Sequence, residues 1–117
     1  MTAPNIVNVA TITGKTAVQA VGTSATAIVT NSASSNKVFK VNALLVSNVD
    51  GTNTASITVD LYRSSTTYHL LKTVSVPAAA SLDVLSKPIY LEEGDALRLT
   101  ANAASDLEAI CSYEEIS

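Results

Sequence analysis

Histidine and cysteine are nearly missing from this chain, because His69 and Cys111 each occur once in 117 residues. Zinc and related metals are held mainly by clusters of these residue types, so the sequence predicts no metal site and no cofactor. A single cysteine also excludes a disulfide within the chain, which fits a reducing compartment. We interpret Cys111 as a core thiol, since it alternates with Ala109 and Tyr113, and His69 as a surface or partly packed side chain. The alternatives are a nucleophilic thiol and a ligating or catalytic imidazole.

The patterns that usually carry catalysis are absent as well. There are four glycines, no G-x-S-x-G nucleophile elbow, and Gly14 and Gly22 have the wrong spacing for a phosphate-binding loop. Carboxylates cluster at 92–95 and at 114–115, but general acid and base groups must converge across a cleft. We interpret the 92–95 cluster as a solvated turn; the alternative is a Ca²⁺ site, although the full EF-hand loop is missing. The sequence therefore predicts no catalytic, cofactor-binding or metal-binding residue, and a protein that is not an enzyme.

Charge is also scarce, at 15% of residues with a net charge of −3, which argues against nucleic-acid binding. It is unevenly spread. Residues 1–49 hold three lysines and no acid, whereas residues 50–117 hold four basic residues against ten acidic ones, a sum of −6. This pattern indicates either chance scatter or head-to-tail complementarity between copies. The sequence has no run of 18 apolar residues and no leader-like start, so we expect no membrane span and no signal peptide.

What the sequence does contain is apolar alternation with a period of two, interrupted by turn residues, which predicts strands. In the segment 55–63, for example, Ile57, Val59 and Leu61 are expected to face the core. In 37–49 the same parity groups Phe39 with Leu45. We expect about eight to ten short strands, with candidates over 6–12, 17–21, 25–30, 37–49, 55–63, 67–76, 82–84, 89–91, 97–101 and 107–116.

The turns between these strands suggest their connections. Asp50-Gly51 between two alternating segments is typical of a hairpin, and Pro77 ends the strand before it can continue. The apolar residues are mostly Val, Ile, Leu and Ala, with one Phe and no Trp, so the core should be thin and without a ligand cavity. We therefore expect an all-β fold: a single antiparallel sandwich or barrel spanning 1–117. Residues 1–14 are the least self-sufficient part and are interpreted as an N-terminal interaction arm.

Three segments carry a resemblance to a known group. They are the segment 88–97 with its Leu-Glu-Glu-Gly-Asp-Ala-Leu pattern, the run 37–48 followed by 55–59, and the closing segment 109–116. Together they resemble small jelly-roll-like virion structural proteins of tailed bacteriophages, of the capsid decoration or cement type. In that group the segment around Gly94 is a hairpin near the end of the domain. The resemblance implies an antiparallel jelly-roll-like β-sandwich of about 8–10 short strands. No individual functional residue carries over.

The resemblance also implies a function. It indicates a capsid decoration protein that stabilises the head by bridging capsomers. Its partners would be the major capsid protein or other virion proteins, and its own copies, with a trimer favoured. Its location would be the virion, assembled in the host cytoplasm. The alternatives are a tail, neck or fibre-attachment component, or a carbohydrate- or cell-surface-binding module. The last needs an exposed aromatic platform, for which the only phenols are Tyr62, Tyr68, Tyr90 and Tyr113.

Overall fold

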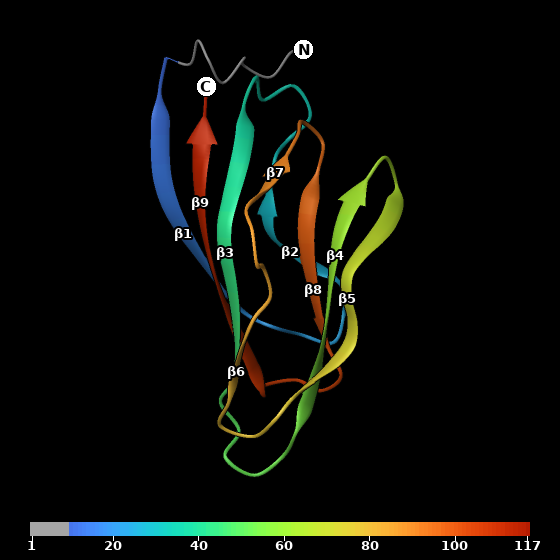
Figure 1. Ribbon diagram of the computed structural model, residues 1–117. Helices are drawn as coiled ribbons and strands as arrows, with labels where there is room; N and C mark the ends of the chain where they lie inside the picture. Colours follow the sequence, from blue (N-terminus) through green and yellow to red (C-terminus); the bar gives the residue numbers. More distant parts are fainter. Residues whose placement is uncertain (1–9) are drawn as a thin grey trace.

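Two antiparallel sheets lie face to face in the computed structural model, which describes residues 10–117 (Figure 1). The first sheet, sheet A, contains β1 (Ile12–Ala20), β9 (Leu107–Ile116), β3 (Val38–Asn48), β6 (Ser81–Asp83) and β7 (Ile89–Leu91). The second, sheet B, contains β2 (Thr26–Thr30), β8 (Ala96–Ala101), β4 (Ala55–Arg63) and β5 (Thr66–Val76). The described residues include no helix that could span a membrane.

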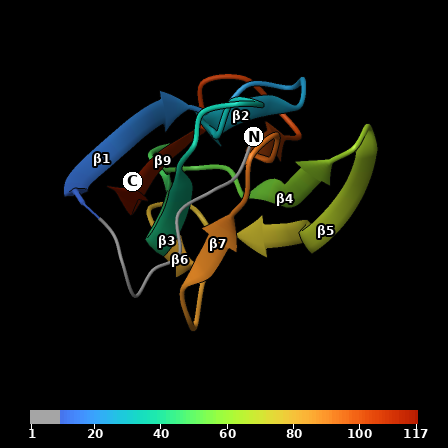
Figure 2. The same cartoon turned by 90° about the horizontal axis from the view of Figure 1, so that it is seen from above.

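The strand order defines a jelly roll. Sheet A runs β1-β9-β3-β6, with β7 also pairing with β3, and sheet B runs β2-β8-β4-β5. The short strands β6 and β7 pair with opposite ends of β3 and together form one interrupted edge. The view from above shows the two sheets side by side with β1 and β2 at one side and β7 and β5 at the other (Figure 2). The predicted fold class, an all-β antiparallel sandwich of jelly-roll type, is confirmed.

The core lies between the sheets and is built from aliphatic side chains. Ile57 and Val59 of β4 are fully buried, as their alternation predicts, while Leu61 packs against them at a more exposed position. The largest fully buried hydrophobic side chains are Leu44, Ile57, Leu91, Leu97, Leu99 and Leu107. Burying a side chain of this size contributes about 1.5–3 kcal/mol, so these residues from both sheets supply much of the folding free energy.

In β3 the expected side-chain phase is wrong in its second half. Phe39 and Val41 face the core, but the pairing with β9 shifts between Val41 and Ala43 at a β-bulge. One extra residue reverses the alternation, so Leu44 is buried and Leu45 points out to solvent. The prediction that placed Phe39 and Leu45 on one face therefore fails because a bulge leaves no mark in the period-two pattern.

The chain between 12 and 20 forms one strand rather than two. Separate strands over 6–12 and 17–21 were expected, but Gly14 between them lies inside β1 and pairs with Glu114 in an uninterrupted register with β9. Residues 1–9, which include most of the predicted strand 6–12 and of the predicted arm 1–14, lie outside the described residues. Of that arm, Ile12 to Gly14 belong to β1.

Both expected hairpins around glycine-containing turns are wrong. β3 belongs to sheet A and β4 to sheet B, so the turn at Asp50-Gly51 crosses the sandwich. The turn around Gly94 likewise connects β7 of sheet A to β8 of sheet B. Gly94 has a φ of +90°, a conformation that favours glycine. The predicted turn at Gly94 is therefore present, although it does not connect two paired strands. Two strands that face each other across a core alternate in the same way as two strands that pair, which is why the sequence did not separate these cases.

Candidate interaction surfaces

The structure confirms Cys111 as a core thiol. It lies on β9 with no exposed surface, and burial raises its pKa to about 11. A thiol with this pKa is almost entirely protonated at neutral pH, and thiolate is the reactive form. Cys111 therefore serves the packing of the core.

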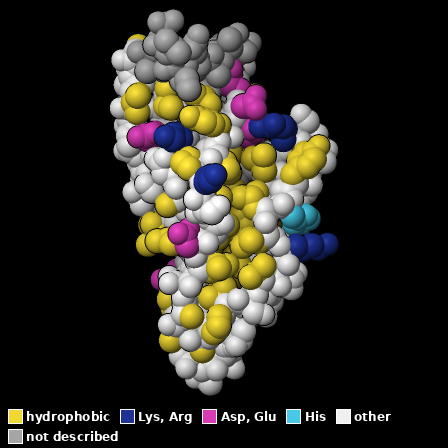
Figure 3. Space-filling view, in the orientation of Figure 1, with side chains coloured by type: hydrophobic (Ala, Val, Ile, Leu, Met, Phe, Trp, Pro, Cys, Tyr) yellow, Lys and Arg dark blue, Asp and Glu magenta, His cyan; other side chains and the backbone are white. Residues whose placement is uncertain are grey.

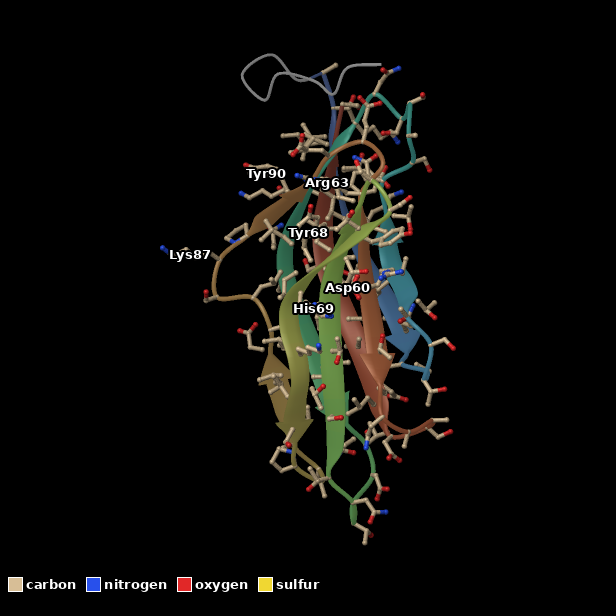
Figure 4. The ribbon with its side chains drawn as sticks, turned by 90° about the vertical axis from the view of Figure 1, so that its right-hand side faces the viewer. Asp60, Arg63, Tyr68, His69, Lys87 and Tyr90 are labelled. Carbon is tan, nitrogen blue, oxygen red and sulfur yellow. The ribbon has the colours of Figure 1, made fainter. Side chains whose placement is uncertain are left out.

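His69 is exposed on β5, opposite Asp60 of β4 (Figure 4). The carboxylate of Asp60 is buried and accepts a hydrogen bond of 2.8 Å from Arg98 Nε. The Arg98 guanidinium in turn lies 4.0 Å from the centre of the Tyr62 ring. Asp60 is thus satisfied by a cation on the outer face of sheet B. Within residues 10–117 no three histidine, cysteine or acidic side chains are grouped so as to hold a metal ion.

The acidic turn at 92–95 is not simply solvated, contrary to the sequence-based interpretation. Asp95 is 1% exposed, and its carboxylate receives two hydrogen bonds from Arg63, one of them from Nε at 2.7 Å. It also accepts the backbone N–H of Glu92 at 2.8 Å. The pKa of Arg63 is raised, first by its hydrogen bond to Asp95. This ion pair between a partly exposed guanidinium and a buried carboxylate ties the β7–β8 turn to the end of β4.

The charge asymmetry of the sequence is used partly within the chain. Glu115 of β9 accepts Lys15 Nζ at 2.9 Å and Lys37 Nζ at 3.0 Å. The pKa of Glu115 is lowered, mainly by the hydrogen bond from Lys15 and then by that from Lys37. Two of the three lysines in residues 1–49 therefore meet an acid of the C-terminal strand in the same molecule.

The four tyrosines do not form one aromatic platform. Tyr113 packs against Phe39, with ring centres 5.6 Å apart, and Tyr62 lies under Arg98. Tyr68 and Tyr90 are exposed, but they come from β5 of one sheet and β7 of the other (Figure 4). Two of the four phenols are therefore engaged in contacts within the chain, which leaves Tyr68 and Tyr90 as the exposed ones.

A row of exposed apolar side chains crosses the outer face of sheet A. Val18 of β1 pairs with Ile110 of β9, and Ile110 pairs with Leu45 of β3. Their side chains are 74%, 48% and 42% exposed, respectively. We call Val18, Ile110 and Leu45 the apolar row. The sequence pattern does not reveal this row, because Leu45 reaches the outer face only through the bulge in β3.

A shallow depression of about 370 Å³ adjoins the apolar row. It is formed by neighbouring residues of β1, β3 and β9, among which Ala20 and Ser47 are small. The full lining is Val18, Gln19, Ala20, Ser47, Glu108, Ala109 and Ile110. Together, the row and the depression give this face a concave apolar surface with one acid, Glu108, at its border.

The side of the sandwich between β5 and the β6–β7 edge is a second apolar surface. Figure 3 shows hydrophobic side chains gathered in a band down the middle of this side. Partly buried hydrophobic residues of the two borders pack against the core: Leu70, Leu71, Val74, Leu82, Val84 and Ile89. Lys87, just before β7, projects away from the sandwich (Figure 4).

Comparison with known proteins adds information on the fold alone. No family model and no curated protein matches the chain. The chain is similar in structure to a protein from the solved structure described as "Bacillus endospore appendages form a novel family of disulfide-linked pili". The match has 13% identity and a TM-score of 0.53, and covers 90% of this chain and 85% of that chain. Those pili are disulfide-linked, whereas the one cysteine of this sequence is buried.

Proposed function

We propose that this chain is a structural protein of a virus particle, a capsid decoration protein whose copies bridge neighbouring capsomers. The apolar row with its adjoining depression carries the proposal. Contiguous exposed apolar patches, unlike single exposed apolar residues, mark protein interaction sites when they are large enough. The jelly-roll topology agrees with the virion proteins that the sequence resembles.

The use of the polar groups points in the same direction. Arg63, Asp95, Asp60 and Arg98 are engaged in ion pairs that fix turns and strands. Cys111 is a neutral core thiol. These four charged groups and the thiol therefore stabilise the fold, and the exposed face of sheet A is available for contacts.

A small subunit of this kind would stabilise a capsid through many weak contacts made by many copies. The apolar row involves three side chains, so one contact is expected to be weak. Copies repeated over a capsid gain effective concentration, because each bound copy holds its other contacts close to their partners.

The test uses purified capsids that lack this protein. Added protein is expected to co-sediment with the capsids and to raise their melting temperature. Ile110→Lys places a charge in the apolar row and should weaken capsid binding at least tenfold. Tyr68→Lys, which changes an exposed side chain on sheet B, is the matched control and should bind as the wild type does. Equal binding by both variants would remove the row from the interface, and no binding by the wild type would contradict the decoration role.

A tail, neck or fibre-attachment component is the second candidate. The likeness to a protein of pilus-forming appendages favours it, because it shows that a chain of this fold is found in an extended assembly. Purified protein that forms rings or filaments by electron microscopy and ignores capsids would support this candidate over decoration.

A further inference from the structure

The four edges of the two sheets differ in how they are protected against pairing with another strand. Short strands, bulges, lysines and prolines are the usual protective devices. β2 has five residues and a bulge in its pairing with β8. β5 carries two register shifts against β4. The β6–β7 edge is broken into two strands of three residues, with Pro88 between them.

β1 has none of these features apart from one lysine. It is nine residues long, contains no proline, and keeps its register with β9 throughout. Lys15 would discourage pairing if its charge projected from the edge. Instead its Nζ reaches inward to Glu115 of β9 at 2.9 Å. Of the edges among the described residues, β1 is therefore the one left open.

The residues whose backbone groups point off this edge can be identified. Thr11 and Ser117 exchange both backbone hydrogen bonds, and Val21 N donates to Leu107 O. Bonded pairs alternate along an antiparallel ladder, so the odd-numbered residues of β1 bond to β9. The N–H and C=O groups pointing outward are then those of five even-numbered residues: Ile12, Gly14, Thr16, Val18 and Ala20.

The contacts within one chain give no reason for a glycine at position 14. A Cβ at this position would meet no atom within 4 Å, and its φ lies outside the range that requires glycine. Glycine inside a strand lowers stability by roughly 0.5–1 kcal/mol relative to alanine. A glycine there often marks the close approach of another backbone.

We infer that β1 pairs antiparallel with β1 of a second copy, about a two-fold axis at Thr16, forming one continuous sheet across two molecules. In this register Thr16 faces Thr16, Gly14 faces Val18, and Ile12 faces Ala20 of the other copy. All of these are even-numbered residues, so the outward backbone groups of all five on each copy are satisfied. The side chain of Val18 lies over Gly14 of the second copy, where no side chain competes for space.

The strand that pairs with β1 belongs to a second copy, because β1 is complementary to itself. In the register about Thr16, Lys15 faces Ala17 of the other copy, so no like charges oppose each other. Thr–Thr pairs across strands are favourable. Among residues 10–117, β1 is the open edge, so within that part of the protein only a second β1 offers an equally open partner. Pairing of one strand with itself closes at two copies. The inference goes beyond the capsid role and would stand without it.

The test measures the mass of the purified full chain by light scattering over a dilution series. We expect an equilibrium between monomer and dimer, because one strand pair is smaller than a standard interface of ~1,600 Å². Thr16→Pro removes an outward N–H and none of the hydrogen bonds to β9, so it should weaken dimerisation at least tenfold. Thr16→Val keeps that N–H and is the matched control, expected to dimerise as the wild type does.

Amide hydrogen exchange of the wild type supplies a second readout that needs no variant. In the dimer, the amides of Gly14, Thr16 and Val18 should be protected, and dilution should release them. The amides of Lys15 and Ala17 bond to β9 and should stay protected throughout. A monomer at concentrations up to ~1 mM, a stable trimer, or even-numbered amides that exchange fast at every concentration would each overturn the inference.

Discussion

Two fully or nearly fully buried asparagines hold the ends of the sandwich together. Asn31 Nδ2 donates to the carbonyl oxygens of Lys37 and Leu91, at 2.9 and 3.0 Å. Asn48 Nδ2 donates to the carbonyl oxygens of Asn53 and Val76, also at 2.9 and 3.0 Å. Each side chain thus joins a loop to a strand that lies far away in the sequence. In the sequence both residues look like ordinary turn formers, because the pattern does not reveal which asparagine points inward.

Removing one of these amides leaves buried carbonyl groups without a donor. We expect Asn48→Ala to lower the free energy of unfolding by about 1–3 kcal/mol, the cost of unsatisfied buried groups. Urea denaturation followed by circular dichroism measures it. Asn53→Ala, at an exposed position of the same loop, is the control and should cost well under 1 kcal/mol. Equal losses for the two variants would mean that the buried amide has no special role.

Glu115 gives the fold a dependence on pH. Its pKa is lowered in the folded state by hydrogen bonds from Lys15 and Lys37. A lowered carboxyl pKa contributes stability that is fully present above the unfolded value of ~4.3 and is lost as pH falls through the folded value. We therefore expect the melting temperature of the wild type to exceed that of Glu115→Gln at pH 7, and the difference to vanish in strong acid.

The control for this prediction is Glu108→Gln, an exposed acid on the same strand. It should change the melting temperature little between about pH 3 and pH 7, the range in which carboxylates of proteins generally titrate. A gap between Glu115→Gln and the wild type that persists unchanged at low pH would show that the effect does not come from the charge.

The β4–β5 connection is the hairpin of sheet B, and its turn residues are not the best available. Ser64 and Ser65 have φ values of 51° and 60°, the left-handed pair of a type I′ turn. Asn-Gly is the sequence that this turn prefers. The double substitution Ser64→Asn and Ser65→Gly should therefore stabilise the protein by about 1 kcal/mol, since left-handed backbone costs most residues 1–2 kcal/mol.

Thermal unfolding checks this expectation through a rise in melting temperature. The reversed order, Ser64→Gly with Ser65→Asn, carries the same two residues and should stabilise less. A melting temperature that does not rise for the Asn-Gly variant would indicate that the turn is not of this type in solution.

Strand positions were predictable where one face of the strand lies on the core, as in β4 and β9. The segment 55–63 was predicted with the bounds that β4 has, and 107–116 with those of β9. What alternation does not encode is the partner of each strand and any local change of phase. The bulge in β3 and the crossings at Asp50-Gly51 and Gly94 depend on contacts between distant segments, so the sequence pattern missed them.

The sequence pattern also does not reveal the interaction surfaces, because these depend on which strands are neighbours in the folded molecule. The apolar row needs Val18, Ile110 and Leu45 on three adjacent strands, and their adjacency follows from the jelly-roll order β1-β9-β3. In the sequence they are isolated apolar residues, each expected inside a strand with a buried face. The scarcity of histidine and cysteine, by contrast, can be read directly from the sequence, because it depends on which residues are present and not on where they lie.

The predicted N-terminal arm, residues 1–14, can now be tested with a better boundary. Deleting 1–14 would remove Ile12 to Gly14 from β1 and so damage the edge of sheet A. Deleting residues 1–9 leaves all of β1 in place. If these residues are the assembly arm, the shortened protein should keep its β-type circular dichroism and melting temperature but lose capsid binding. Because β1 stays intact, pairing between two copies should persist. Loss of the folded signal would instead make 1–9 part of the core, and unchanged capsid binding would leave the apolar row to act without an arm.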